Sequence, residues 1–142
     1  MSDFRLTKAE RLKSRKVLQT LFREGKSLGI PPIRMVWWER EVEDAESPVQ
    51  IAVTVPKRAF GKAVLRNRLK RRMREAYRLQ KSRLLDHYQP DDRQLAILFI
   101  YTGRKEIPYQ DIERSMKHLL KRLVKKLRNA AANQPDTKNE RL

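Results

Sequence analysis

The 142-residue sequence contains no cysteine and only four glycines. Without cysteine the chain can form neither a disulfide scaffold nor a thiolate-ligated zinc site, and this composition is typical of the reducing cytoplasm. We therefore expect a cytoplasmic protein. The scarcity of glycine and the lack of a GxxxxGK[ST] stretch argue against a nucleotide-binding loop, and we expect no small-molecule substrate.

Long apolar runs are also missing from the sequence. No stretch approaches the ~20 apolar residues needed to cross a bilayer. The N-terminal segment is polar and lacks the apolar core of a signal peptide. The length corresponds to one ordinary domain. We expect a single folded domain over residues 1–128, a polar and disordered tail over residues 129–142, and no association with a membrane.

Groups that could perform catalysis are few and scattered. The two histidines, His87 and His118, are far apart in the sequence and belong to no metal-binding motif. Asp91 and Asp92 fall in an expected turn, where aspartate commonly forms local hydrogen bonds. A protein that hydrolyses phosphodiesters usually needs clustered carboxylates for metal ions, or a histidine acid and base. We therefore expect no catalytic residue, no metal ligand and no cofactor bound by the protein itself.

Acidic residues are nearly absent from the segment that carries most of the positive charge. The whole chain has 34 lysines and arginines against 17 aspartates and glutamates, a formal net charge of +17. Residues 57–83 hold 12 of these basic residues and a single acid, Glu75, which gives this segment a net charge of +11. Such a field attracts polyanions, and nucleic acid is the leading candidate.

The patterns of apolar residues predict an α+β fold. The stretch VQIAVTV alternates apolar with small or polar side chains, as a half-buried strand does, and LAILFIYT is apolar almost throughout, as a central strand is. The order α-β-β-α-β-α indicates a two-layer sandwich of helices packed on a mixed or antiparallel sheet. The predicted elements are helices over residues 8–24, 64–85 and 109–127, and strands over residues 33–40, 49–55 and 95–102.

The helix predicted over residues 64–85 has an apolar side and a basic side. At 100° per residue, Leu65, Leu69 and Met73 fall on one stripe that should face the core. Basic residues follow one another at intervals of four on the opposite side, where each like-charge pair costs a few tenths of a kcal/mol. Selection for stability alone would mix in glutamates, so this side is predicted to bind phosphate groups. It comprises Arg66, Lys70, Arg74, Arg78 and Lys81, flanked by Asn67 and Arg71, with Arg68 and Arg72 near the other edge of the apolar stripe.

Residues 63–76, AVLRNRLKRRMREA, resemble the signature helix of the bacterial ribonuclease P protein component. The shared pattern is Arg-Asn-Arg, then Lys-Arg two residues on, then a further arginine. The preceding VTVPKRAFGKAV and the N-terminal RLKSRKVLQTLFREGKS are also similar to the family, so the resemblance covers roughly residues 5–127. The matching positions of the pattern are Arg66, Asn67, Arg68, Lys70, Arg71 and Arg74.

The resemblance implies a specific function. Members of the family pair with a large catalytic RNA, expected here at a ratio of 1:1. The holoenzyme removes the 5′ leader from precursor transfer RNA by magnesium-dependent hydrolysis. The RNA carries the chemistry, so Mg²⁺ is required by the RNA-catalysed reaction rather than by the protein. The family fold includes a left-handed crossover, an exception to the usual handedness.

The resemblance also implies two RNA contact sites. One is the basic helix with the turn before it, which would contact the catalytic RNA. The other is a groove between the first helix and the sheet, which would contact the leader. The predicted catalytic-RNA contacts are Arg66, Asn67, Arg68, Lys70, Arg71, Arg74, Arg78, Lys57, Arg58 and Lys62. The predicted groove residues are Leu18, Phe22, Val36 and Thr54, among which only Phe22 is aromatic, with Trp37 or Trp38 as substitutes if the register differs.

Composition alone leaves two other functions open. One is a ribosomal or general RNA-binding structural protein. The other is a basic amphipathic helix that binds a membrane surface or a calmodulin-like partner, although its apolar stripe is modest and lacks tryptophan and phenylalanine. The sequence also leaves two interpretations open for each of two side chains. Asn67 either contacts a sugar, a base edge or a metal-bound water or is structurally indifferent, and Phe22 either lines the groove or packs in the core.

Overall fold

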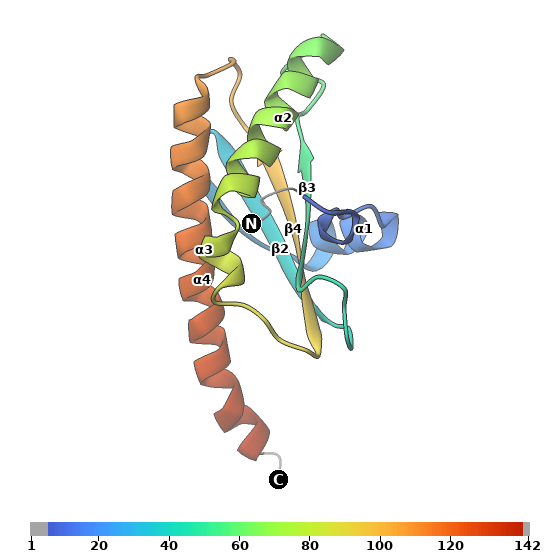
Figure 1. Ribbon diagram of the computed structural model, residues 1–142, viewed down its shortest axis with the longest axis vertical. Coiled ribbons are helices and arrows are strands. Elements are labelled where there is room, and N and C mark those ends of the chain that lie inside the picture. The colour runs from blue at the N-terminus through green and yellow to red at the C-terminus, as the bar shows by residue number, and fades with distance from the viewer. Residues whose placement is uncertain (1–5, 141–142) are drawn as a thin grey trace.

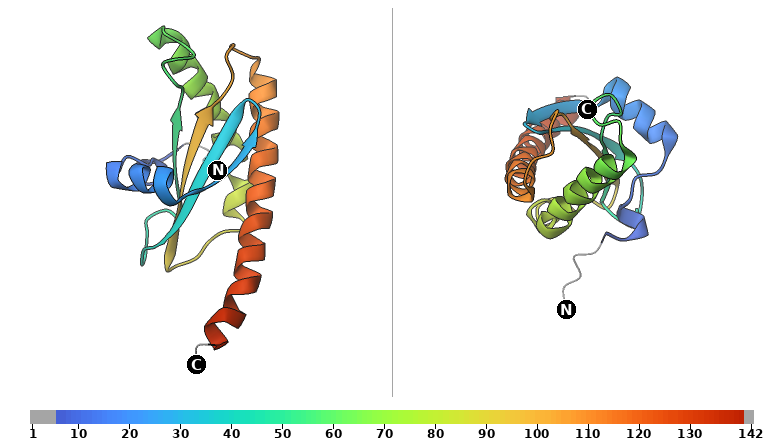
Figure 2. Two further views of the ribbon diagram at one scale, coloured as in Figure 1. Left: turned by 180° about the vertical axis from the view of Figure 1, so that it is seen from behind. Right: turned by 90° about the horizontal axis from the view of Figure 1, so that it is seen from above.

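The computed structural model describes residues 6–140, with side chains for residues 6–131. One four-stranded sheet has α1 on one face and α2 and α4 on the other (Figures 1 and 2). The α+β class predicted from the sequence is confirmed, with helices on both faces of the sheet. The elements are η1 (Lys8–Glu10), α1 (Arg15–Glu24), β1 (Lys26–Ile30), β2 (Ile33–Glu41), β3 (Val49–Thr54), α2 (Ala63–Gln80), α3 (Ser82–Leu85), β4 (Arg93–Tyr101) and α4 (Tyr109–Glu140).

The sheet is mixed, with the strand order β1-β2-β4-β3. Strands β1 and β2 form an antiparallel hairpin, β2 and β4 are also antiparallel, and β3 pairs with β4 in parallel. Strand β4 therefore has neighbours on both edges and helices over both faces. This position explains its apolar sequence, because a central strand covered on both faces has no side turned to water.

Side chains of the central strands alternate between two apolar clusters. Met35 and Trp37 of β2 belong to the larger core, which β2 shares with α2 and α4. Val36 and Trp38 of the same strand pack on the other face, against residues of α1. The predicted alternation of this strand is therefore confirmed. Trp37 pairs with Ile97 of β4, and both side chains belong to the larger core. The alternative register, in which Trp37 would lie on the face of α1, is therefore excluded.

The parallel strands β3 and β4 are joined by α2 and α3, which cross the face of the sheet. In Figure 1 both strands point up the page, α2 lies in front of them, and β4 lies to the left of β3. A right-handed crossover would place β4 to the right. The connection is therefore left-handed, as the resemblance implied.

The N-terminal segment departs from the single helix predicted over residues 8–24. Residues between η1 and α1 are extended, because Arg11 forms a bridge with Ile51 and the Leu12 amide donates to the Ile51 carbonyl at 2.8 Å. Helix α1 begins only after Ser14, whose hydroxyl accepts from the amide of residue 17 at 3.3 Å. Backbone pairing with β3 has replaced the first helical turns, a tertiary effect that local periodicity cannot reveal.

Helix α1 ends at Glu24, directly before Gly25, as the sequence predicted. A residue larger than glycine would not fit at position 25. A Cβ atom on Gly25 would lie 2.5 Å from the Leu21 carbonyl oxygen and 2.7 Å from a methyl carbon of Val36. The φ angle of Gly25 is −71°, so its backbone does not require glycine. The close approach of the helix end to β2 does.

Three further features differ from the prediction: a missed strand, an interrupted helix and an extended helix. Strand β1 was missed, and it raises the number of strands to four. The helix predicted over residues 64–85 is interrupted at Lys81, which separates α2 from α3. Helix α4 continues past the predicted end at residue 127, and its backbone is described as far as Glu140. The division into a domain and a tail at residue 129 stays a prediction, because the side chains of residues 132–142 lie outside the described residues.

Candidate nucleic-acid interface

Helix α2 is fixed to the core by one side and leaves the other to solvent. Leu69, Met73, Ala76 and Tyr77 are completely buried. The predicted apolar stripe is therefore confirmed, with Tyr77 as an addition. The first turns of α2 project past the ends of the strands (Figure 1).

Three cations on α2 have neither an acidic partner nor a side-chain hydrogen bond to another of the described residues. They are Lys70, Arg71 and Arg74, each within the predicted basic side. Asn67 is exposed beside them, and its side chain makes no hydrogen bond to another described residue. The turn before α2 adds more exposed positive charge close in sequence to the start of the helix. Its basic residues are Lys57, Arg58 and Lys62.

Arg66 fixes the turn that precedes α2. One guanidinium nitrogen donates to the carbonyl oxygens of Phe60 at 2.7 Å and Gly61 at 2.9 Å. The side chain is half-buried. Arg66 thus holds the chain that carries Lys62 against the helix, a structural role in addition to the predicted RNA contact.

The other arginines of α2 have carboxylate partners. Arg68 lies 3.1 Å from Glu106, and Arg72 lies 3.5 Å from the same carboxylate and also donates to the Ile107 carbonyl. Arg78 is paired with Glu75 one turn earlier. Positive charge on α2 is therefore compensated along the edge near the start of α4. It has no carboxylate partner at Lys70, Arg71 and Arg74, or at Arg66, which contacts only backbone carbonyls.

Lys81 does not belong to the basic side, where the helical projection placed it. Its ammonium lies 3.1 Å from the Glu10 carboxylate, and only 11% and 9% of the two side chains are exposed. The amide of Thr7 also donates to Glu10, at 3.0 Å. The N-terminal segment therefore supplies an internal acid that no feature of the helix sequence could indicate.

Arg11 joins the basic surface, although the sequence did not single it out. With Arg71, Arg74 and Arg78, and with one acid, Glu75, it lines a cavity of about 450 Å³. Burial, and then the nearby Arg11 guanidinium, lower the pKa of Arg74. A second cavity, of about 380 Å³, runs from Arg11 and Arg74 to the exposed edge of β3. An excess of arginine in one place suits an anionic ligand, because the cations repel one another without it.

The predicted groove residues differ in accessibility. Phe22 is 68% exposed, which rules out the interpretation that it packs in the core. Leu18 and Thr54 are half-buried, whereas Val36 is 4% exposed beneath α1 and offers little surface. Trp38 packs with Leu18 on this face of the sheet and supplies the second aromatic ring, whereas Trp37 points into the opposite core.

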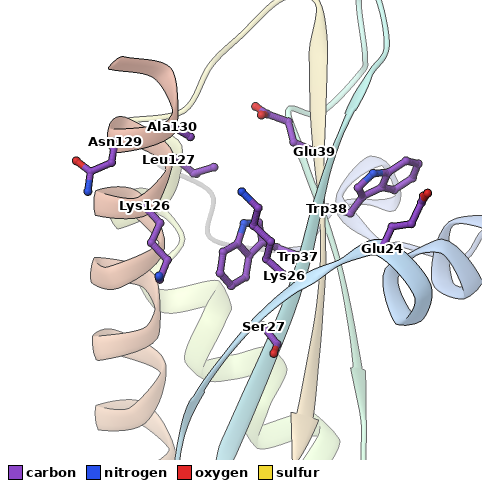
Figure 3. Close-up of a pocket in the computed structure, with 10 residues that line it drawn as sticks. All are labelled: Glu24, Lys26, Ser27, Trp37, Trp38, Glu39, Lys126, Leu127, Asn129 and Ala130. Atoms are coloured by element: carbon purple, nitrogen blue, oxygen red, sulfur yellow. The ribbon is translucent and has the colours of Figure 1, made fainter. Parts of the chain in front are cut away.

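A larger hollow lies at the edge of the sheet, away from α2. Its volume is about 690 Å³, and it lies between the C-terminal half of α4 and the start of β1 (Figure 3). Its charged side chains balance, because Lys26 and Lys126 are matched by Glu24 and Glu39.

Among the described residues, no three histidine, aspartate or glutamate side chains are grouped so that they could hold a metal ion. None of the described helices combines the length and apolarity needed to cross a bilayer.

Comparison with known proteins identifies the family. Residues 6–124 match the family model described as Ribonuclease P. The chain is 36% identical over 123 residues to the ribonuclease P protein component of Porphyromonas gingivalis, covering 87% of this chain and 89% of that protein. It is 35% identical over 127 residues to the corresponding protein of Chlorobaculum tepidum, covering 84% and 82%.

Solved structures agree with the sequence relatives. The RNase P protein of Staphylococcus aureus superimposes with a TM-score of 0.60 at 27% identity, over 80% of this chain and 94% of that one. The RNase P protein of Thermotoga maritima gives a TM-score of 0.60 at 25% identity, over 80% and 96%. This chain therefore belongs to the bacterial ribonuclease P protein component family.

Proposed function

We propose that the chain binds the catalytic RNA of ribonuclease P through α2 and the 5′ leader of precursor transfer RNA through the groove between α1 and the sheet. Membership of the family makes it a subunit of an endoribonuclease that contains ribonuclease P RNA. The proposal adds what each surface of this chain contacts. It also includes a 1:1 ratio of protein to RNA and a cytoplasmic location.

The observation that carries the proposal is the uncompensated charge of Lys70, Arg71 and Arg74 on one flank of α2, where Arg71 and Arg74 are exposed and Lys70 is half-buried. Each guanidinium can form two parallel hydrogen bonds with a phosphate, and release of counterions from RNA favours such contacts. Arg11 adds a fourth cation at this flank. Asn67, exposed in the same stretch, provides a neutral donor and acceptor for a sugar or base edge.

The groove on the other face of the sheet suits a single-stranded leader. Phe22 presents an exposed ring from α1, and Trp38 lies on the same face. Aromatic rings stack on bases without regard to sequence, which suits leaders of varied sequence, and each stacked base contributes about 1–3 kcal/mol. Thr54 at the end of β3 supplies a small polar contact.

The chemistry of cleavage is assigned to the RNA and its bound Mg²⁺ rather than to this chain. The described residues offer no grouped carboxylates for a pair of metal ions. The basic side chains instead lower the repulsion between two polyanions that must lie close together, which reduces the concentration of Mg²⁺ needed for assembly. The protein thus acts on affinity and placement.

Reconstitution tests the proposal. The full chain, added to its matching catalytic RNA at low Mg²⁺, should raise the rate of precursor cleavage and lower the KM. The variant Lys70→Gln/Arg71→Gln/Arg74→Gln should lose this effect and bind the catalytic RNA at least tenfold more weakly. A matched control, Arg15→Gln/Lys16→Gln/Arg23→Gln, removes the same charge from exposed positions of α1 and should bind the catalytic RNA like the wild type.

Two results would contradict the proposal. One is that the wild-type chain gives the catalytic RNA no gain in affinity or turnover. The other is that the α2 variant and the α1 control lose affinity equally, which would mean that net charge alone, rather than the flank of α2, governs binding. A separate measurement distinguishes the proposed subunit from a general RNA-binding protein. In the presence of the catalytic RNA, a general RNA-binding protein would bind precursor and mature transfer RNA equally well.

A further inference from the structure

Helix α4 carries a second set of basic residues that the sequence analysis did not separate from the rest. Residues 114–128 contain seven lysines and arginines and no acidic residue. The apolar residues of this stretch, such as Met116, Leu120 and Leu123, are buried against the sheet and α2. The remaining side of the helix faces solvent. Its basic residues, here named the α4 basic surface, are Arg114, Lys117, Lys121, Arg122, Lys125 and Arg128.

Most of this charge is uncompensated. Arg114 lies 3.6 Å from Asp111, and Arg128 contacts the ring nitrogen Nδ1 of His87 at 2.9 Å. Lys117, Lys121 and the other members have no acidic partner in the part of the chain that the structure describes. From Lys117 to Arg128 the surface therefore presents positive charge without a carboxylate partner over about 17 Å of helix, at a rise of about 1.5 Å per residue.

The stability of the helix does not account for this arrangement. Lys117, Lys121 and Lys125 form a row at intervals of four residues, in which each like-charge pair is unfavourable by a few tenths of a kcal/mol. Cations stabilise a helix only within its last turn, and α4 continues to Glu140, about four turns past Lys125. The row thus carries a small energetic penalty unless an anion binds there.

Carboxylates separate the α4 basic surface from the flank of α2. Glu113 on α4 and Glu75 on α2 both lie near Tyr109, and together with burial, the largest cause, they raise the pKa of Tyr109 to about 12. Glu106, in the loop before α4, pairs with Arg68 and Arg72 on the side of α2 that is nearest to α4. One continuous strand of phosphates that crossed from α2 to α4 would have to pass these acids, so the two surfaces fit two separate anionic segments.

We propose that the α4 basic surface binds the phosphate backbone of a second RNA segment, distinct from the one on α2. The row formed by Lys117, Lys121 and Lys125, about 6 Å apart along the helix, can contact successive phosphates. This inference rests on the proposed function only in assigning the segment to the same catalytic RNA.

An anionic membrane is a poorer fit to this surface. Interfacial helices place large apolar side chains in the lipid beside their cations. The large apolar side chains that are exposed in the described part of the chain are Phe22, Val64 and Leu79, and none of them lies on α4. The surface can therefore offer electrostatic attraction but no insertion, which suits a phosphate backbone.

The test compares the salt dependence of binding to the catalytic RNA alone. The variant Lys121→Gln/Lys125→Gln should bind about tenfold more weakly near physiological salt, and the slope of log affinity against log salt should fall by about two. Lys121→Arg/Lys125→Arg keeps the charge and should retain the wild-type slope. Arg15→Gln/Lys16→Gln removes the same charge from α1, on the opposite face of the sheet, and should also retain it.

The outcomes separate this inference from the proposed function. A wild-type slope in Lys121→Gln/Lys125→Gln, with a reduced slope in the α2 variant, would overturn the α4 surface and leave the proposed function intact. If the α4 variant lost binding to anionic phosphatidylserine vesicles while its RNA slope was unchanged, the surface would be a membrane site instead. If the wild type did not prefer the catalytic RNA over unrelated RNA, the proposed function would fail, whereas a reduced slope in the α4 variant would still support a phosphate-binding surface.

Discussion

Tyr77 shows how one buried hydroxyl affects stability. The side chain is completely buried in the core beneath α2, with its ring 5.8 Å from that of Phe99. Its hydroxyl has no hydrogen-bond partner among the described residues. A buried polar group without a partner costs about 1–3 kcal/mol, because it gives up water and gains nothing in return. The ring therefore contributes to stability and the hydroxyl opposes it.

Tyr77→Phe should raise the free energy of unfolding by about 1 kcal/mol at neutral pH. It should also weaken the loss of stability in alkali. Burial, and then the nearby Glu10 carboxylate, raise the pKa of Tyr77 in the folded protein. In the unfolded chain the hydroxyl ionises near pH 10. Its ionisation there stabilises the unfolded chain, so the free energy of unfolding is unaffected below that pH and falls above it. Urea unfolding at pH 8 and pH 10.5 would measure both effects, and an identical pH dependence in the variant would contradict them.

The pair between Lys81 and Glu10 makes a second prediction for single residues. Lys81→Met should destabilise the fold by about 3–5 kcal/mol, because it leaves the Glu10 carboxylate buried without its cation. The double variant Lys81→Met/Glu10→Gln should recover part of the loss, since it removes the buried charge. Thermal and urea unfolding of both variants would check this. Equal stability of the single and double variants would show that the carboxylate is hydrated in the single variant.

At the scale of elements, the sequence predicted the parts whose burial follows a regular period. The alternation in β2 and β3, the apolar run of β4 and the stripe of α4 were all identified, because each element contributes one regular face or side to the core. Strand β1 was missed because its sequence, KSLGI, has only two large apolar residues and lies at the edge of the sheet. The break between η1 and α1 was missed because pairing with β3 determines it.

The candidate interface was predicted less completely than the fold. Helical projection placed Lys70, Arg71 and Arg74 on the basic side of the helix, and in the structure Arg71 and Arg74 are exposed and Lys70 is half-buried. It could not show that Lys81 pairs with an acid 71 residues away. Nor could it show that Glu106 compensates Arg68, because partners distant in sequence leave no trace in the periodicity of a helix. Arg11 was overlooked for the same reason, since only the fold brings it to Arg74.

Glu106 yields a prediction about helix α2 as a binding element. Its carboxylate holds Arg68 and Arg72 and thereby limits the uncompensated charge to one flank of the helix. Glu106→Gln should release two arginines and raise the affinity for unrelated RNA several-fold, with a smaller gain for the catalytic RNA. The ratio of the two dissociation constants at fixed salt measures this loss of specificity. An unchanged ratio would mean that Glu106 does not restrict where RNA binds.

At the scale of the whole molecule, the two proposed RNA sites lie on opposite faces of one sheet. Helix α2 packs on one face of the sheet and α1 packs on the other (Figure 2). Arg11 and Leu12 connect them, because Arg11 lines a cavity with α2 residues while Leu12 packs beneath α1. Because the other residues of the two sites lie on opposite faces of the sheet, a variant at one of them can affect one RNA contact without the other.

Phe22→Ala tests this separation. The side chain is 68% exposed, so its removal should leave the free energy of unfolding nearly unchanged. Affinity for the catalytic RNA should also be retained. The preference of the holoenzyme for precursor over mature transfer RNA should fall by about 1–3 kcal/mol if Phe22 stacks on a leader base. Competition between the two transfer RNAs in a binding assay would measure it, and an undiminished preference would exclude Phe22 from the leader site.

The strand order β1-β2-β4-β3 bears on how the chain acquires its fold. Strands β2 and β3 are consecutive in the chain yet never touch as partners, because β4 must enter between them. Closing the sheet therefore waits for a segment that is synthesised after α2 and α3, and contacts of such long range are slow to form. An N-terminal fragment that stopped before Arg93 would keep every arginine of α2 but would lack the central strand that gives the helix its direction.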